Sequence, residues 1–161
     1  MIKLCEIETK YGEYLVDEDK LKELLVKPEP KTVWDLEDGD KYYLISHYGK
    51  VERITWNDDE FDLRRREYGN AFLTREEAKF EAGRQECEAT MLKYGRRTFK
   101  PGKNNYYIDF VHYHGNVIYI SHNCKTHSQG SIYFDTKELA KKAINEIGEE
   151  RLKKYVFRIE E

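Results

Sequence analysis

The sequence predicts an α+β protein, in which a unit of three antiparallel strands and one helix occurs twice behind an N-terminal β-hairpin and short helix. Three observations indicate this architecture. Aromatic and β-branched residues alternate with polar residues in short segments, as in half-buried strands. Two longer segments carry apolar residues at helical spacing. Phe72, Thr74, Glu76 and Ala78 recur 62 residues later as Phe134, Thr136, Glu138 and Ala140.

Residues 1–32 are expected to form the N-terminal hairpin and helix. Ile2–Thr9 alternates apolar and charged residues, and Glu13–Val16 can return as the second strand. Asp17 is a suitable N-cap for a short helix, which must end before Pro28 because proline does not fit inside a helix. This segment is too small to fold alone, so we expect it to pack against the residues that follow.

The first repeated unit is predicted over residues 33–93. Tyr42–Ile45 and Val51–Trp56 form its hairpin, and a polar, acidic stretch that follows is expected to be a solvated loop. A helix should begin after Thr74, because Thr74 and Glu77 have the spacing of a capping box.

The second unit is predicted over residues 105–161, after a basic linker at 94–104. Tyr106–Ile108 and Val117–Ile120 form its hairpin, and a second helix should begin at about Thr136. The match between the units predicts that Phe72 and Phe134 are buried at equivalent positions, since each precedes a helix that must pack on its strand.

Composition limits the classes of function. The chain has 161 residues, with 28 Lys and Arg against 31 Asp and Glu, so its formal charge is -3 and no unit has a basic excess. This charge does not favour non-specific attraction to nucleic acid. No apolar run approaches a membrane span, the N-terminus lacks the pattern of a signal peptide, and the three cysteines lack metal-site spacing. We therefore expect a cytoplasmic protein with free thiols.

Local clusters of cations and tyrosines are the candidate binding residues. Phosphate groups or an acidic protein surface could be bound by such cations, and strand tyrosines could stack on bases or contact a protein. Solvated side chains and ordinary strand tyrosines are the alternative. The candidates are Arg64, Arg65, Arg66, Lys93, Arg96, Arg97, Lys100, Lys103, Tyr106 and Tyr119.

Histidines and one cysteine gather near the second hairpin, at His112, His114, His122, Cys124 and His127. Zinc uses these donor types, but the spacing fits no standard zinc finger. We expect them to be polar strand and loop residues, with no metal or cofactor. No phosphate-binding glycine loop, catalytic triad or paired-carboxylate signature is present, so the sequence favours a non-enzymatic protein.

Two short patterns and one longer order of elements resemble known families. Residues 34–51 read W-x4-G-x-x-Y-Y-L-I-S-x-x-G-K-V, which is similar to NUMOD4-type DNA-binding modules of phage homing endonucleases. Residues 72–78, F-x-T-x-E-E-A, resemble the strand-to-helix step of AP2-type DNA-binding domains. Over residues 33–156 the order of hairpin, step, basic linker and tyrosine-rich hairpin resembles uncharacterised small accessory proteins of Gram-positive phages and prophages.

The resemblance to phage accessory proteins implies a partner and a setting. It implies binding to a host protein or protein–nucleic-acid complex in the bacterial cell, and inhibition of a host defence system in the manner of anti-CRISPR proteins. The alternative function is a nucleic-acid-binding module that uses the basic linker and the tyrosine-rich strands. A metal-dependent enzyme built on the histidine cluster is the third hypothesis.

Overall fold

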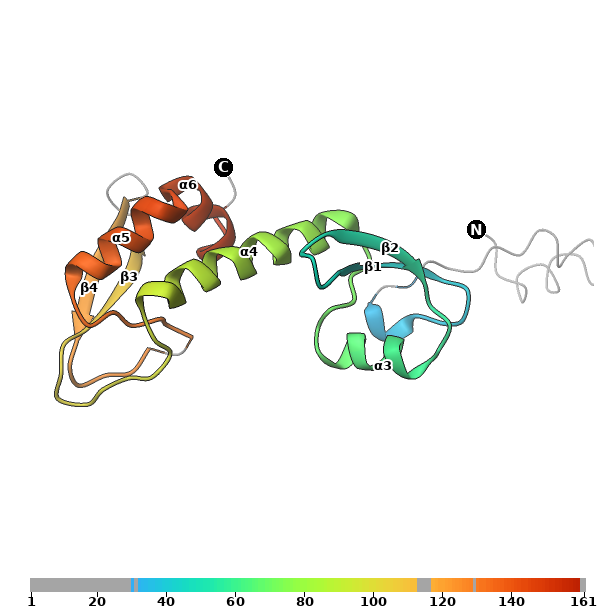
Figure 1. The fold of residues 1–161 in the computed structure, drawn as a ribbon, viewed down its shortest axis with the longest axis horizontal. Helices are drawn as coiled ribbons and strands as arrows, with labels where there is room; N and C mark the ends of the chain where they lie inside the picture. Colours follow the sequence, from blue (N-terminus) through green and yellow to red (C-terminus); the bar gives the residue numbers. More distant parts are fainter. Residues whose placement is uncertain (1–29, 31, 113–116, 129, 160–161) are drawn as a thin grey trace, which may run out of the picture. The chain divides into compact units, whose positions relative to one another are not determined.

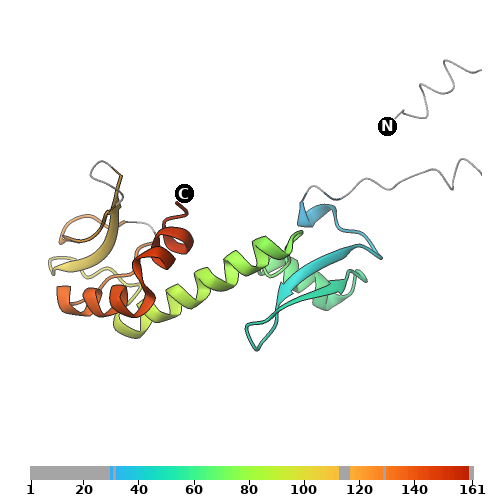
Figure 2. The same ribbon diagram turned by 90° about the horizontal axis from the view of Figure 1, so that it is seen from above.

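The computed structural model describes residue 30 and residues 32–112, 117–128 and 130–159 (Figures 1 and 2). The predicted N-terminal hairpin and helix lie outside the described residues. The chain divides into Met1–Lys31 and Thr32–Glu161, and the second of these contains all the elements below.

The first hairpin consists of β1 (Lys41–Ile45) and β2 (Val51–Thr55), paired antiparallel. Alternate side chains of a strand face the same side, and Tyr42 and Leu44 of β1 are accordingly both buried. They form a core with Trp56 and with residues outside the hairpin, namely Leu36 and Ala71. A single 3-10 turn, η1 (Val33–Asp35), precedes the hairpin.

A helix occupies the acidic stretch for which the sequence predicted a solvated loop. This helix, α3 (Glu60–Glu67), begins after Asp59, whose side chain accepts a hydrogen bond from the backbone N–H of Asp62. The loop prediction is wrong because Asp62 is almost completely buried rather than solvated. Asp59 is therefore the N-cap of α3.

The long helix α4 (Arg75–Tyr94) begins where the sequence predicted it. The Thr74 side chain accepts a hydrogen bond from the Glu77 N–H, and the Glu77 carboxylate accepts one from the Thr74 N–H. The helix contacts β1 and β2, and it also contacts the helical elements of the C-terminal part of the chain.

The second hairpin consists of β3 (Asn105–Val111) and β4 (Val117–Asn123), again antiparallel, with Ile108 opposite Ile120. Helix α5 (Lys137–Ile147) lies beside this hairpin in both views (Figures 1 and 2). The sequence allowed either Asp135 or Thr136 as its N-cap, and the structure has Thr136, whose side chain accepts a hydrogen bond from the Leu139 N–H. The core between these elements is larger than the first one, and its buried members are Cys87, Met91, Ile132, Phe134, Ala140, Ala143, Ile147 and Leu152.

The α+β class is confirmed, but each sheet has two strands rather than three. The third strands were predicted at residues 69–74 and 130–136, where the chain makes isolated bridges instead. Phe72 pairs with Tyr43 in the first unit, whereas Phe134 pairs with Tyr106 and Tyr133 with Arg96 in the second. The bridges of Phe72 and Phe134 each join a residue shortly before a helix to the first strand of the hairpin. Burial differs between the two positions, because Phe134 is fully buried whereas Phe72 is only partly buried.

The chain after α5 folds back onto α4. It forms the short helix α6 (Glu149–Arg151) and a π-helical turn, η2 (Leu152–Val156), which contacts α4. The Tyr155 ring lies on Gly83, where an added Cβ would be 2.5–2.9 Å from three ring atoms. Gly83 therefore allows the close approach of η2 to α4.

The helices and the cysteines bear on two further properties, membrane spans and disulfides. None of the helices among the described residues combines the length and hydropathy needed to cross a membrane. Cys87 and Cys124 are free thiols, the first buried and the second exposed, while Cys5 lies outside the described residues.

Candidate functional site

The three consecutive arginines of α3 each have a partner within the chain. Arg64 forms an ion pair with Glu60 at 2.6 Å on the exposed side of the helix. The Arg66 guanidinium lies between two indole rings, 4.8 Å from the centroid of Trp34 and 4.9 Å from that of Trp56. Such cation–π contacts hold the guanidinium in place. These side chains point to different partners, so they do not form one phosphate clamp.

Arg65 belongs to a buried polar cluster. The Tyr42 hydroxyl donates to Asp62 Oδ1 at 2.5 Å, and Arg65 Nη1 lies 3.1 Å from that same oxygen. The other Asp62 oxygen accepts the backbone N–H of Asn57 at 2.7 Å. Burial, reinforced by the hydrogen bond to Asp62, raises the pKa of Tyr42 to about 12. The cluster joins β1 to α3, and its role is structural.

The raised pKa of Tyr42 predicts a loss of stability in alkaline solution. Since the ordinary pKa is 10.0, the unfolded chain releases this proton before the folded protein does. The contribution of Tyr42 is therefore complete below pH 10 and is lost as the pH rises towards 12. Urea denaturation between pH 9 and about 12 should show this extra loss relative to Tyr42→Phe. Parallel pH profiles for the two proteins would contradict it.

The basic linker is a folded loop built around a buried amide. The Asn105 side chain is completely buried; its Nδ2 donates to the backbone carbonyls of Lys100, Lys103 and Asn123. Its Oδ1 accepts from the Lys100 N–H at 2.9 Å and from Arg96 Nη2 at 3.0 Å. Arg96 also contacts Asp135 at 3.0 Å and the Thr98 carbonyl. Arg96 therefore holds the loop rather than extending into solvent.

The other cations in and next to the linker pair with carboxylates that lie outside it. Lys93 contacts Glu146 at 2.9 Å, Lys100 contacts Asp135 at 3.0 Å, and Arg97 pairs with Glu88. Hydrogen bonds from Lys100 and Arg96 hold the pKa of Asp135 below its usual range. Lys103 is exposed and makes no ion pair within the part of the chain that the structure describes. The local excess of cations in the sequence is thus largely neutralised in the fold.

The two candidate tyrosines differ in environment. Tyr106 is half-buried against the larger core and pairs with Phe134. Tyr119 is partly exposed, and its hydroxyl donates to Asp109 at 2.8 Å. A stacking platform needs several rings on one open face, and these two residues face opposite sides of the hairpin. The structure does not bring them together.

The histidine cluster is spread over the second hairpin and its loop. Among the described residues, no three His, Cys, Asp or Glu side chains converge as metal ligands. His122 is opposite Tyr106, at the end of the hairpin far from His112. His127 lies against the rings of Phe99 and Tyr133, with centroids 5.9 Å apart in both cases. His114 lies outside the described residues.

An exposed stripe of hydrophobic and cationic character runs along α3 and its C-cap residue, and sequence reasoning found only its arginine, Arg64. Phe61, Arg64 and Tyr68 are spaced three and four residues apart and so lie on one helical face. Phe61 is 71% exposed and Tyr68 is 79% exposed. We call these three residues the α3 stripe. The aromatic spacing within residues 61–68 was visible in the sequence, but only as part of a supposed loop.

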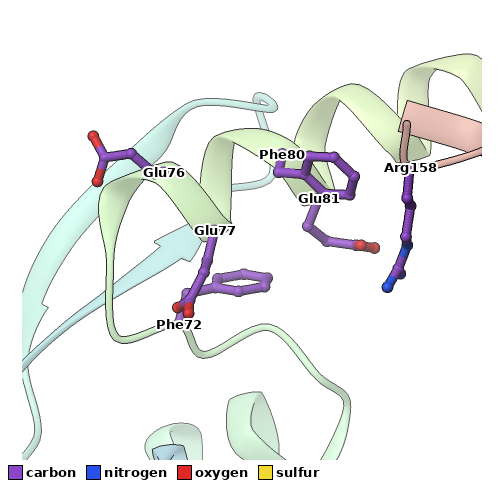
Figure 3. A pocket seen from close by; sticks show the side chains of 6 residues that line it. All are labelled: Phe72, Glu76, Glu77, Phe80, Glu81 and Arg158. Carbon is purple, nitrogen blue, oxygen red and sulfur yellow. The ribbon is translucent and has the colours of Figure 1, made fainter. Parts of the chain in front are cut away.

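A shallow pocket lies along the first turns of α4, and we call it the α4 groove. Its volume is 410 Å³, and it is lined by Phe72, Glu76, Glu77, Phe80, Glu81 and Arg158. Figure 3 shows the Phe72 ring and the carboxylates of Glu77 and Glu81 around the hollow, with Arg158 beside them and the Glu76 carboxylate turned outward. A hydrogen bond from Arg84 holds the pKa of Glu81 below its usual range, and Arg158 adds to this.

Comparisons with known proteins did not identify a relative of this chain. No protein-family model, curated protein or solved structure matches the chain. The resemblance to phage accessory proteins therefore stays a prediction.

Proposed function

We propose that this chain is a non-enzymatic binding protein whose target is a protein of a bacterial host. One observation carries the proposal: Lys93, Arg97 and Lys100, which could have bound phosphate, are paired with carboxylates of the same chain. A phosphate would have to displace those carboxylates, on a chain whose net charge is already -3. Among the described residues, the large exposed hydrophobic side chains include Phe61 and Tyr68.

The α3 stripe is the surface proposed to contact the target. Exposed aromatic residues next to an arginine are typical of the energetically important centres of protein interfaces. Arg64 is 60% exposed, and its pair with Glu60 is an exchangeable surface contact. A carboxylate of the target can replace Glu60 and bind Arg64 while Phe61 and Tyr68 become buried. The proposed target therefore presents an acidic group beside an apolar surface.

The biological setting rests on the resemblance described above. Phage and prophage accessory proteins act inside the bacterial cell, and inhibition of a host defence system, as by anti-CRISPR proteins, is the activity proposed here. Burial of the α3 stripe against a defence protein would block that protein without any chemical reaction.

A salt titration of nucleic-acid binding tests the proposal against its alternative. We expect only weak binding to duplex DNA, single-stranded DNA and RNA, with Kd above about 10 μM at about 150 mM salt. The comparison variant is Arg97→Glu with Lys103→Glu, because both side chains are exposed; Arg96 is avoided because it holds the linker loop. Sub-micromolar binding that this variant abolishes, with a log–log salt slope of about -0.9 per phosphate, would overturn the proposal.

A further inference from the structure

The C-terminal segment places one arginine over the α4 groove. The guanidinium carbon of Arg158 lies 5.7 Å from the centroid of the Phe80 ring. Arg158 has φ 54°, a left-handed conformation that is unfavourable for a residue other than glycine. The turn before it is anchored, because the Tyr155 ring packs between Gly83 and Phe80, with the two ring centroids 5.5 Å apart.

The chemistry of the groove fits a planar cation. Phe72 and Phe80 offer aromatic surface, and the carboxylates of Glu77 and Glu81 lie beside it, whereas that of Glu76 is turned outward (Figure 3). A guanidinium can stack on an aromatic ring while its N–H groups donate to carboxylates at the edge. Thr74 N–H donates to Glu77, and Arg84 donates to Glu81. Each carboxylate can accept further hydrogen bonds, which a guanidinium can donate and an apolar group cannot. An anion would meet the charge of both carboxylates. The guanidinium of Arg158 already lies over one of these rings, that of Phe80.

We infer that the α4 groove binds an arginine side chain of the target protein, in place of the chain's own Arg158. The inference rests on the proposed function and adds a second contact with the target. The α3 stripe requires an acidic group on the target, whereas the α4 groove requires a cationic one. The incoming guanidinium lies on Phe72 and Phe80 between Glu77 and Glu81. Arg158 is the internal competitor, and release of its left-handed backbone favours the exchange.

The test uses two short capped peptides that differ in one side chain. The first is Ser-Gly-Arg-Gly-Ser, and the second has citrulline, which has nearly the same shape without the charge, in place of arginine. Each is titrated into the isotopically labelled full-length protein while backbone amide NMR signals are followed. The arginine peptide should shift the amides of Phe72, Phe80 and Glu81, and the citrulline peptide should bind at least about threefold more weakly.

Variants locate the binding within the groove. Glu81→Gln should weaken binding of the arginine peptide by about two- to fivefold. Glu88→Gln is the control and should leave this binding unchanged, because Glu88 also pairs with Arg84 at 2.7 Å but does not line the groove. Arg158→Gln should tighten binding by a similar factor, because it removes the competitor. Lys125→Gln is its control, since it makes the same change in net charge on an exposed loop residue.

Three results would overturn the inference: equal binding of the two peptides, amide shifts confined to another surface, or Arg158→Gln without any gain. These results concern the groove alone. If they were accompanied by nuclease-resistant binding of a protein through the α3 stripe, the proposed function would stand without the groove. Salt-sensitive binding of nucleic acid at sub-micromolar Kd would instead remove the proposed function.

Discussion

Replacing Phe134 with alanine is expected to lower the free energy of unfolding by about 3–5 kcal/mol. Phe134 is fully buried and belongs to the larger core, where it packs among residues of α4 and α5. Its backbone also pairs with Tyr106, so the cavity would open between the helix and the hairpin. Chemical denaturation measures the change directly.

Phe72→Ala is the matched control, because Phe72 holds the equivalent position before α4 and makes the equivalent bridge to Tyr43. Its ring is only partly buried, and it faces the α4 groove. We therefore expect a clearly smaller loss of stability than for Phe134→Ala. Equal losses, or no loss for Phe134→Ala, would contradict the burial described here.

Replacing Asp62 with alanine is expected to have the second large effect, a loss of about 3 kcal/mol or more. The substitution leaves the Tyr42 hydroxyl and the Asn57 N–H without their acceptor in a buried site. It also leaves the Arg65 guanidinium without its carboxylate.

Glu60→Ala in the same helix is the control for charge removal. Glu60 is exposed and its pair with Arg64 lies at the surface, so its loss should cost less than about 1 kcal/mol. Urea denaturation of the two variants at neutral pH compares them. Similar midpoints for Asp62→Ala and Glu60→Ala would show that the polar cluster does not hold β1 to α3.

Local patterns in the sequence predicted the elements with strong local signals. The capping box of Thr74 and Glu77 fixed the start of α4, and the alternating segments around Tyr42 and Tyr106 identified the hairpins. Helix α3 was missed because its buried side includes a carboxylate, Asp62, which a composition argument assigns to solvent. The third strands were overestimated because the segments before α4 and α5 form isolated bridges rather than continuous strand pairing.

The candidate site was harder to predict because its charges pair across long stretches of chain. Arg96 meets Asp135, 39 residues away, and Lys93 meets Glu146, 53 residues away. A window along the sequence shows only the cations and none of these acids. Asn105 gave no signal either, since its five hydrogen-bonding contacts exist only once the linker is folded around it.

Affinity capture from a nuclease-treated lysate of a Gram-positive host tests the central claim, that the target is a protein, most directly. Three baits are compared: the unchanged protein, the double variant Phe61→Ser with Tyr68→Ser, and Tyr48→Ser, which alters another exposed tyrosine outside α3. We predict one host protein that is retained after nuclease treatment, lost with the double variant and kept with Tyr48→Ser. Capture that disappears with nuclease, or that the double variant leaves unchanged, would contradict the account.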